Sequence, residues 1–454
     1  GGHENIIAVI GDGSLSGGEA YEGLSNAGEM GTNLIIVVND NEMSIAENHG
    51  GLYQNLKELR DTEGRSSCNF FRSLGLDYLY VGEGNDIPSL VAAFAKVKDT
   101  SRPTVVHIHT QKGKGYAPAE ADREEFHWEM PFDLETGKPK VDCSGMEDYH
   151  SLTGKFLLEK MKEDHTVVAI SSGTPTVIGF TPERRKQAGR QFVDVGIAEE
   201  HAVALASGIA AGGGHPVYGV YSTFIQRCYD QLSQDLCING NPAVITVFMG
   251  TVAGMNDVTH LGFFDIPLIS NIPNMVYLAP TCSEEYFAML EWAVRQTEYP
   301  VAIRVPGVAV VHRKEEFDTD YSELNRYKMT ARGETVAILA LGSFYDLGQA
   351  LKNKLREESG VEATLINPRY ITGLDEPMLE ELKVGHRIVV TLEDGVLDGG
   401  FGEKIARYYG NSEMRVLNYG LRKEFADRYN LDELMKANRL TDKQMAEDIA
   451  GILE

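Results

Sequence analysis

Short apolar runs separated by longer mixed segments dominate this sequence. The runs Ile6 to Ile10, Leu34 to Val38 and Val105 to Ile108 each have the length of a buried strand. The segments between them are long enough for a helix, which is the usual connection between parallel strands. We therefore expect a doubly wound α/β unit in the first part of the chain.

Two further series of apolar runs repeat this pattern after a polar stretch. Turn-forming residues between Pro131 and Ser151 indicate a linker. The chain has 454 residues, which also suits about three domains. We expect an α/β protein with three domains, two built on parallel sheets and a third α/β domain at the end, at residues 1–135, 147–312 and 325–454.

Composition narrows the class of protein. Hydrophobic residues make up 43% of the chain, yet no apolar run approaches the ~18 residues of a membrane helix. A net charge of −25 argues against nucleic acid as a partner, because a phosphate backbone requires a basic face. The five cysteines are odd in number and show no CxxC spacing, so we expect no disulfide framework or zinc site and a cytoplasmic location.

Small and polar residues follow the first two apolar runs. Gly11, Asp12 and Gly13 come directly after one run, and Asn39 to Asn41 come directly after the next. The carboxyl ends of parallel strands are where open α/β sheets bind ligands, and small residues let a diphosphate approach the backbone. A carboxylate, a side-chain amide and a backbone carbonyl suit Mg²⁺, so Asp12, Asn41 and the Met43 carbonyl are candidate metal ligands.

Gly-Asp-Gly alone also fits a strand-end turn whose aspartate caps a helix. The occurrence of both motifs, Gly11 to Gly13 and Asn39 to Asn41, favours the ligand site.

His107 and His109 lie two apart on a predicted strand, but no carboxylate or cysteine partner is evident in the sequence. We therefore predict a structural role for these two histidines and no metal.

Several motifs together resemble the 1-deoxy-D-xylulose-5-phosphate synthase family of transketolase-like, thiamine diphosphate-dependent enzymes. They cover nearly the whole chain and occupy residues 11–18, 39–45, 112–120, 194–203, 221–230, 259–262, 367–369 and 399–402. The resemblance implies thiamine diphosphate and Mg²⁺ as cofactors. It also implies a homodimer, for which the small residues between Ala202 and Gly214 are suited, although an interior helix explains them equally well.

The resemblance assigns roles to individual residues. Glu199 matches the glutamate that hydrogen-bonds N1′ of the aminopyrimidine and so promotes loss of the thiazolium C2 proton. His127 and His260 match histidines that face the reacting carbon and the substrate. The other expected contacts to the cofactor come from Asp12, Gly13, Ser14, Asn41, Tyr116, Tyr221 and Phe224.

The implied reaction joins pyruvate to D-glyceraldehyde 3-phosphate, releases CO₂ and forms 1-deoxy-D-xylulose 5-phosphate, a precursor of isoprenoids, thiamine and pyridoxal. Arg227 and Arg304 match arginines that bind the acceptor phosphate, and a guanidinium fork suits a phosphate dianion. An ordinary ion pair is the alternative role for each arginine.

Four departures from the family pattern stand out. Met249 and Gly250 replace an Asp-Arg pair, and Glu200 stands where a glutamine is usual. The stretch from Ala46 to Cys68 is shorter than the usual insert. The long front segment that carries further diphosphate contacts is not visible, so we expect it in another stretch of protein or a separate chain.

These departures keep two alternatives open. A transketolase-like ketol transferase with a different acceptor would account for Met249. A non-catalytic paralogue or assembly subunit would account for the front segment that is not visible.

Overall fold

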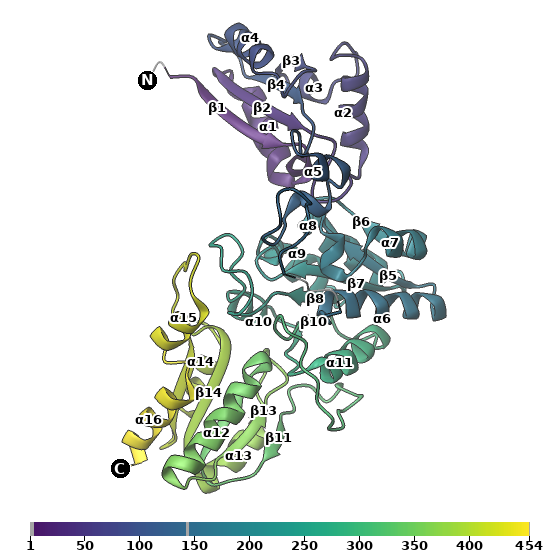
Figure 1. The fold of residues 1–454 in the computed structure, drawn as a ribbon. Helices are drawn as coiled ribbons and strands as arrows, with labels where there is room; N and C mark the ends of the chain where they lie inside the picture. The colour runs from purple at the N-terminus through teal and green to yellow at the C-terminus, as the bar shows by residue number, and fades with distance from the viewer. Residues whose placement is uncertain (1–3, 142–144, 454) are drawn as a thin grey trace. The chain divides into compact units, whose positions relative to one another are not determined.

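The computed structural model describes residues 4–141 and 145–453, and within them it contains three β-sheets flanked by helices (Figure 1). The strand orders are β1-β2-β4-β3, β6-β5-β7-β8-β10-β9 and β11-β13-β12-β14-β15. Every pairing described is parallel except that of β11 with β13. The predicted α/β class is therefore confirmed.

The first sheet is covered by helices on both faces. Its strands are β1 (Ile6–Gly11), β2 (Leu34–Asp40), β3 (Asp77–Val81) and β4 (Thr104–His109). Ile36 and Val38 of β2 pack with α1 (Gly18–Met30), α2 (Gly51–Asp61) and α3 (Phe70–Ser73). Ile35 and Val37 point to the opposite face and pack with α4 (Ile87–Val97). The alternation along β2 explains why its apolar run is continuous.

Strand β1 lies at the edge of this sheet, and its side chains are much more exposed than those of β2 (Figure 1). Ile6 is 62% exposed and Val9 is 71% exposed. The apolar pattern correctly predicts a strand here. In the described part of the chain, however, no residue of this strand is buried.

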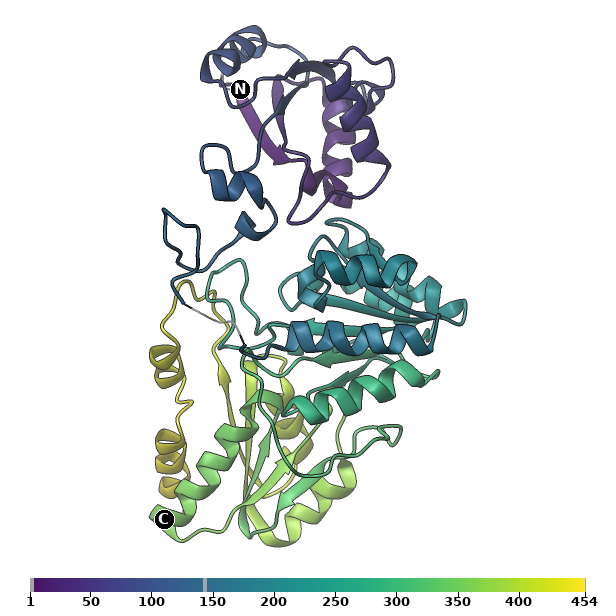
Figure 2. The ribbon, with the colours of Figure 1, turned by 45° about the vertical axis from the view of Figure 1, so that its right-hand side comes forward.

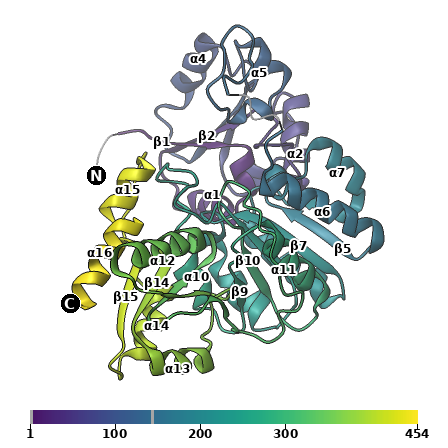
Figure 3. The ribbon, with the colours of Figure 1, turned by 60° about the horizontal axis from the view of Figure 1, so that its bottom comes forward.

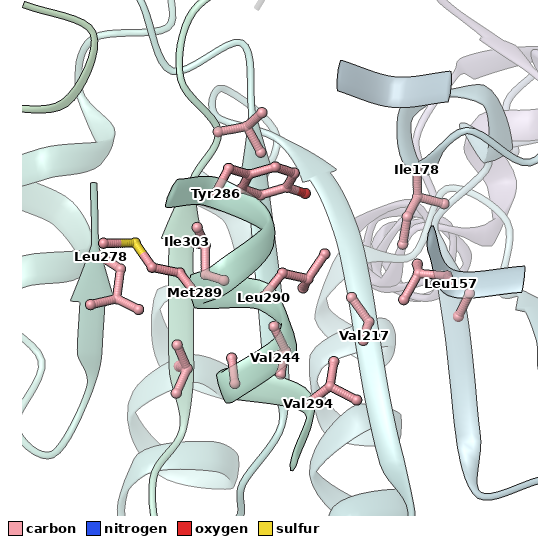
Figure 4. Packing of buried hydrophobic residues seen from close by; sticks show 14 of the residues in the cluster. Leu157, Ile178, Val217, Val244, Leu278, Tyr286, Met289, Leu290, Val294 and Ile303 are labelled. Carbon is pink, nitrogen blue, oxygen red and sulfur yellow. The ribbon is translucent and has the colours of Figure 1, made fainter. Parts of the chain in front are cut away.

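The second sheet carries the largest apolar cluster described. Its strands are β5 (Val167–Ser171), β6 (Phe192–Asp194), β7 (His215–Tyr221), β8 (Val244–Phe248), β9 (Val276–Leu278) and β10 (Val301–Arg304). Val217, Val244 and Ile303 of this sheet meet Leu290 of α11 (Ser283–Arg295), as Figure 4 shows. The helices α6 (Tyr149–Glu163), α7 (Pro182–Ala188), α8 (Glu199–Ala211) and α10 (Asp265–Ser270) also belong to this series.

The third sheet contains β11 (Lys328–Ala331), β12 (Thr335–Ala340), β13 (Thr364–Asn367), β14 (His386–Val396) and β15 (Arg415–Leu421). Its helices are α12 (Tyr345–Ser359), α13 (Glu376–Gly385), α14 (Phe401–Tyr409), α15 (Leu431–Ala437) and α16 (Asp442–Leu453). Helices α12 and α16 lie side by side (Figures 2 and 3). Leu351 and Leu355 of α12 and Ile449 of α16 are fully buried there.

The fold divides into two compact units. One comprises residues 1–146 with the short segments 171–175 and 194–199, and the other comprises 147–170, 176–193 and 200–454. Part of the predicted linker, including Cys143, lies outside the described residues. Within 4–141 and 145–453, no helix combines the length and apolarity of a membrane span.

Candidate active site

Asp12 follows β1 and is almost completely buried, with 1% of its surface exposed. The amide of Asn48 donates to its Oδ2 at 2.7 Å. Burial, and next the charge of Asp40, raise the pKa of Asp12 to about 6. The charge of Lys112 attracts this carboxylate, but no ion pair of Asp12 is found among the described residues. A buried carboxylate is a natural ligand for a metal ion.

The turn after Asp12 is packed so closely that only glycine fits at position 13. A Cβ atom on Gly13 would lie 2.7 Å from Cβ of Ser44. The Tyr53 hydroxyl donates to the Gly13 carbonyl at 3.1 Å, and the Ser16 hydroxyl donates to the same oxygen at 2.8 Å. These contacts fix the turn, while the neighbouring Ser14 is exposed.

The end of β2 carries three polar residues with different contacts, Asn39, Asp40 and Asn41. Asn39 accepts a hydrogen bond from Thr110, and Asn41 accepts one from the Met43 amide at 3.3 Å. Asp40 is fully buried and pairs with Arg60. The hydrogen bonds from His107 and Arg60 outweigh burial and lower the pKa of Asp40. Asp40 is therefore an anchor for the turn that presents Asn41.

The role of Asp40 as an anchor also accounts for the buried position of His107. Its Nε2 lies 2.8 Å from Oδ2 of Asp40, and its Nδ1 lies 2.7 Å from the Tyr78 hydroxyl. Both His107 and Asp40 are fully buried. The carboxylate partner that the sequence did not reveal is thus Asp40, sixty-seven positions earlier in the chain. His109 pairs instead with Glu42 at 2.9 Å.

Glu199 begins α8 and is 3% exposed. It belongs to the segment 194–199, which packs with residues 1–146 as one unit. Within that unit Ser16 Oγ lies 3.2 Å from the Ile197 carbonyl oxygen. The Asp194 carboxylate fixes the segment by accepting from the amides of Gly173 and Gly196. The fold therefore brings the Glu199 motif beside the Gly13 turn.

Lys112 is a site residue that the sequence argument left without a role. Its ammonium donates to the Ser44 carbonyl at 2.7 Å and to Nδ1 of His127 at 3.2 Å. Burial lowers the pKa of Lys112. Burial, and next the Lys112 charge, lower the pKa of His127. The motif Lys112-Gly-Lys-Gly was visible in the sequence, but its first lysine has no periodicity or spacing that marks it.

Tyr116 stands against two aromatic rings, those of Phe126 and Phe132, with ring centroids at 5.7 and 5.9 Å. Its hydroxyl is buried and has no hydrogen-bond partner among the described residues. A buried hydroxyl without a partner is costly, so Tyr116 fits a contact with a bound ligand.

Tyr221, Phe224 and His260 form a second aromatic group. The rings of Tyr221 and Phe224 meet edge to face at 5.5 Å, and Phe224 meets the His260 ring at the same distance. Burial raises the pKa of Tyr221. The Thr259 hydroxyl bonds Nδ1 of His260 at 2.8 Å and so orients its ring. The three predicted residues are brought together as expected for a shared site.

The two predicted phosphate-binding arginines both have carboxylate neighbours. Arg227 Nε lies 3.3 Å from Oε1 of Glu200. Arg304 is 4% exposed, and its Nε donates to Asp265 at 2.7 Å. Met249, one of the two residues that stand in place of the expected Asp-Arg pair, is half-buried and has a φ of 57°.

The donor set fits Mg²⁺ and thiamine diphosphate. Asp12 and the Asn41 amide supply hard oxygen atoms, and the Gly13 cradle has no room for a side chain. Within the described part of the chain, no group of three or more His, Cys, Asp or Glu side chains could hold a metal ion. A metal here would therefore depend on amide, carbonyl and ligand oxygens in addition to Asp12.

Three family models match consecutive parts of the chain. Residues 1–69 match 1-deoxy-D-xylulose-5-phosphate synthase, residues 147–310 match the transketolase pyrimidine binding domain, and residues 326–445 match the transketolase C-terminal domain. The 1-deoxy-D-xylulose-5-phosphate synthase of Lachnoclostridium phytofermentans is 34% identical, over 96% of this chain and 76% of that protein. The synthase of Clostridium tetani is 33% identical, over 99% and 78%.

Solved structures support the fold. A split gene transketolase in an inactive beta4 tetramer matches with a TM-score of 0.56 at 22% identity, over 68% of this chain and 98% of that chain. A transketolase from Pichia stipitis in complex with sedoheptulose-7-phosphate matches with a TM-score of 0.55 at 15% identity, over 98% and 76%. At these identities the likeness concerns the fold alone.

Proposed function

Since this chain belongs to the 1-deoxy-D-xylulose-5-phosphate synthase family, it is a transketolase-like transferase with that synthase activity, and we propose pyruvate and D-glyceraldehyde 3-phosphate as its substrates. The products of this reaction are CO₂ and 1-deoxy-D-xylulose 5-phosphate. The observation that carries the proposal is the buried carboxylate of Asp12, a suitable metal ligand. It lies next to Gly13, where the structure has no space for a side chain.

The pyrimidine-binding model implies thiamine diphosphate as the cofactor. When bound, thiamine diphosphate supplies the carbon nucleophile and the electron sink that decarboxylation of pyruvate requires. We propose that Asp12, Asn41 and the Met43 carbonyl hold Mg²⁺, and that Gly13 and Ser14 lie against the diphosphate. The Asn48 bond to Asp12 orients the carboxylate for this purpose.

We propose that Glu199 holds a proton at N1′ of the aminopyrimidine. Its position supports this role, because Glu199 begins α8, is 3% exposed and belongs to the same compact unit as the Gly13 turn. The rings of Tyr221 and Phe224 would exclude water from the aminopyrimidine ring. The Tyr116 hydroxyl, which has no partner among the described residues, would form a hydrogen bond with the cofactor.

We propose that His127 and His260 act on the substrates. Burial, and next the Lys112 charge, lower the pKa of His127 and so favour its neutral form, which can accept a proton. The Thr259 hydroxyl holds His260 in one orientation. Arg227 would attract the acceptor phosphate in competition with Glu200. Arg304 is 4% exposed and donates to Asp265, so the ion pair that was the alternative role fits it better than a phosphate contact.

Product formation tests the proposal. The full chain is incubated with pyruvate, D-glyceraldehyde 3-phosphate, thiamine diphosphate and Mg²⁺, and CO₂ and the sugar phosphate are measured. We expect both products in equal amounts and their loss in Glu199→Gln. Absence of CO₂ from a preparation that binds thiamine diphosphate would contradict the proposal.

A different acceptor is a second candidate, and Met249 is the observation that favours it. Met249 and Gly250 stand in place of the Asp-Arg pair expected from the family, so an expected cation is lacking, and Glu200 neighbours Arg227. Comparing D-glyceraldehyde with its 3-phosphate distinguishes the two candidates. A synthase prefers the phosphate by at least about tenfold, the value of one charge-assisted contact.

We also propose that the chain forms a homodimer. Ala202, Ala206 and Ala210 of α8 are buried within the chain itself, so they do not distinguish an interior helix from an interface helix. Sedimentation equilibrium across a range of protein concentrations measures the assembly state directly.

A further inference from the structure

A cavity lies in the first compact unit, beside the start of α1. It has a volume of about 880 Å³, and all of its lining residues lie between Leu15 and Ser73. Asp12, Gly13 and Asn41 do not line it, although its lining begins at Leu15, next to the proposed diphosphate contact Ser14. A cavity of this size accommodates a small organic molecule.

The cavity has an apolar wall. Tyr21 and Phe70 contribute neighbouring aromatic rings with centroids 6.3 Å apart, and Leu52 of α2 adds an aliphatic surface. Tyr21 is 52% exposed, so its ring is accessible from the cavity side of α1. This wall suits the hydrocarbon part of a ligand.

The remaining lining favours a negative charge. The chain has 67 acidic and 42 basic residues, yet the lining contains Arg72 and no acidic residue. Arg72 has no ion pair among the described residues. Gly18 also lines the cavity as the first residue of α1, where the backbone N–H groups and the helix dipole attract anions.

Asn69 provides an independent indication of a ligand. Its side chain lines the cavity and is 5% exposed. Its Oδ1 accepts from the Arg72 amide at 3.1 Å, whereas its Nδ2 is buried and has no hydrogen-bond partner. A buried donor without an acceptor is costly, and an anionic oxygen in the cavity would satisfy it.

We propose that this cavity binds a small organic anion with an apolar body, such as an alkyl or aryl phosphate. The anionic group contacts Arg72, Asn69 Nδ2 and the start of α1, and the apolar body packs on Tyr21, Leu52 and Phe70. Binding here is independent of thiamine diphosphate.

Cys68 offers a direct readout, because this exposed free thiol lines the cavity. Alkylation of Cys68 by iodoacetamide is followed by peptide mass spectrometry in the full chain, with hexyl phosphate, hexan-1-ol or inorganic phosphate added. We expect hexyl phosphate to protect the thiol best and Arg72→Gln to weaken protection at least about tenfold. Equal protection by hexanol, or none by hexyl phosphate, would overturn the proposal.

A matched pair of variants controls for folding. A Cβ atom at Gly18 would meet no atom within 4 Å, and Gly18 lines the cavity, so Gly18→Leu should abolish protection by hexyl phosphate. Gly23 lies on the same helix, also has open space and does not line the cavity, so Gly23→Leu should leave protection unchanged. Equal effects of both variants would overturn the proposal.

Two further measurements separate this site from other sites. Saturating thiamine diphosphate should not compete with hexyl phosphate, and Asp12→Asn should keep full Cys68 protection. Loss of protection in either case would place the anion at the diphosphate turn. If Gly18→Leu instead shifts the sedimentation of the free protein, the cavity is an interface between chains, and the proposal fails.

Discussion

Arg227 Nε lies 3.3 Å from Oε1 of Glu200, so the arginine predicted to hold the acceptor phosphate already has an anionic neighbour. Both side chains are about one third exposed. Water and salt screen the attraction between these two side chains. A phosphate dianion therefore competes with the Glu200 carboxylate for the Arg227 guanidinium and is also repelled by that carboxylate.

Replacing Glu200 with glutamine should remove one anionic neighbour of Arg227 and so strengthen its attraction for a phosphate. We expect Glu200→Gln to lower the KM for D-glyceraldehyde 3-phosphate several-fold and to leave the KM for unphosphorylated D-glyceraldehyde nearly unchanged. Steady-state kinetics with both acceptors measure the effect. Glu291→Gln, which removes a comparable pairing with Lys160, is the control. An equal change for both acceptors would contradict a phosphate-specific role.

Asp12 should be essential for Mg²⁺-dependent cofactor binding. Asparagine keeps the shape of the side chain but removes the charge, so Asp12→Asn should weaken thiamine diphosphate binding about a hundredfold or more. Isothermal titration with and without Mg²⁺ measures this loss. Asp86→Asn is the control, because Asp86 caps α4 and asparagine caps a helix equally well. Unchanged binding in Asp12→Asn would exclude it as a metal ligand.

Lys112 should govern the protonation of His127. Removing its charge in Lys112→Met should raise the pKa of His127, although burial will continue to hold that pKa below its ordinary value. Nuclear magnetic resonance of the imidazole protons, assigned with His127→Gln, gives the titration curve. Lys114→Met removes an exposed charge two residues away and should not move it. An unmoved His127 titration in Lys112→Met would show that the 3.2 Å contact does not persist in solution.

Asp265 should be needed for folding, because it pairs with the buried Arg304. Asp265→Asn leaves a guanidinium that is 4% exposed without its carboxylate, and losses of roughly 3–5 kcal/mol are typical for such a change. Denaturant unfolding measures the free energy. Asp61→Asn removes the exposed pair with Lys57 and should cost less than about 0.5 kcal/mol. Equal costs for the two variants would mean that Arg304 is not held mainly by Asp265.

Glu393 should make stability depend on pH. Burial raises its pKa to about 7 from an ordinary value of 4.5, although the amides of Gly402 and Phe401 oppose this shift. The folded state then binds the proton more tightly than the unfolded chain. The resulting stability is complete below about pH 4.5 and is lost as pH rises through 7, by about 3 kcal/mol in total.

Glu393→Gln should remove this dependence, since glutamine does not titrate. We expect the difference in unfolding free energy between the native chain and the variant to change by about 3 kcal/mol between pH 4.5 and pH 8. Glu403→Gln, at an exposed position of the following helix α14, should retain the native pH profile. A constant difference for Glu393→Gln would show that the carboxyl group is ionised throughout.

The sequence by itself determined the local elements and the chemistry of the cofactor turn. Apolar runs mark β2, β4 and β8 because a buried parallel strand needs apolar side chains on both faces. Gly13 was identifiable because small residues at the end of a strand let a diphosphate approach the backbone. In the structure Ser44 fills the space that a Cβ atom at position 13 would need. Such requirements are local and leave a mark at each position.

Only the tertiary structure decided which side chains meet. Asp40 joins His107 across sixty-seven positions, and Lys112 joins His127 across fifteen. Arg304 faces Asp265 inside the protein, although its sequence setting matched a phosphate ligand. The physical reason is that electrostatic and hydrogen-bond partners act over a few ångströms in space, and that proximity is set by how strands and helices pack, which no spacing along the chain encodes.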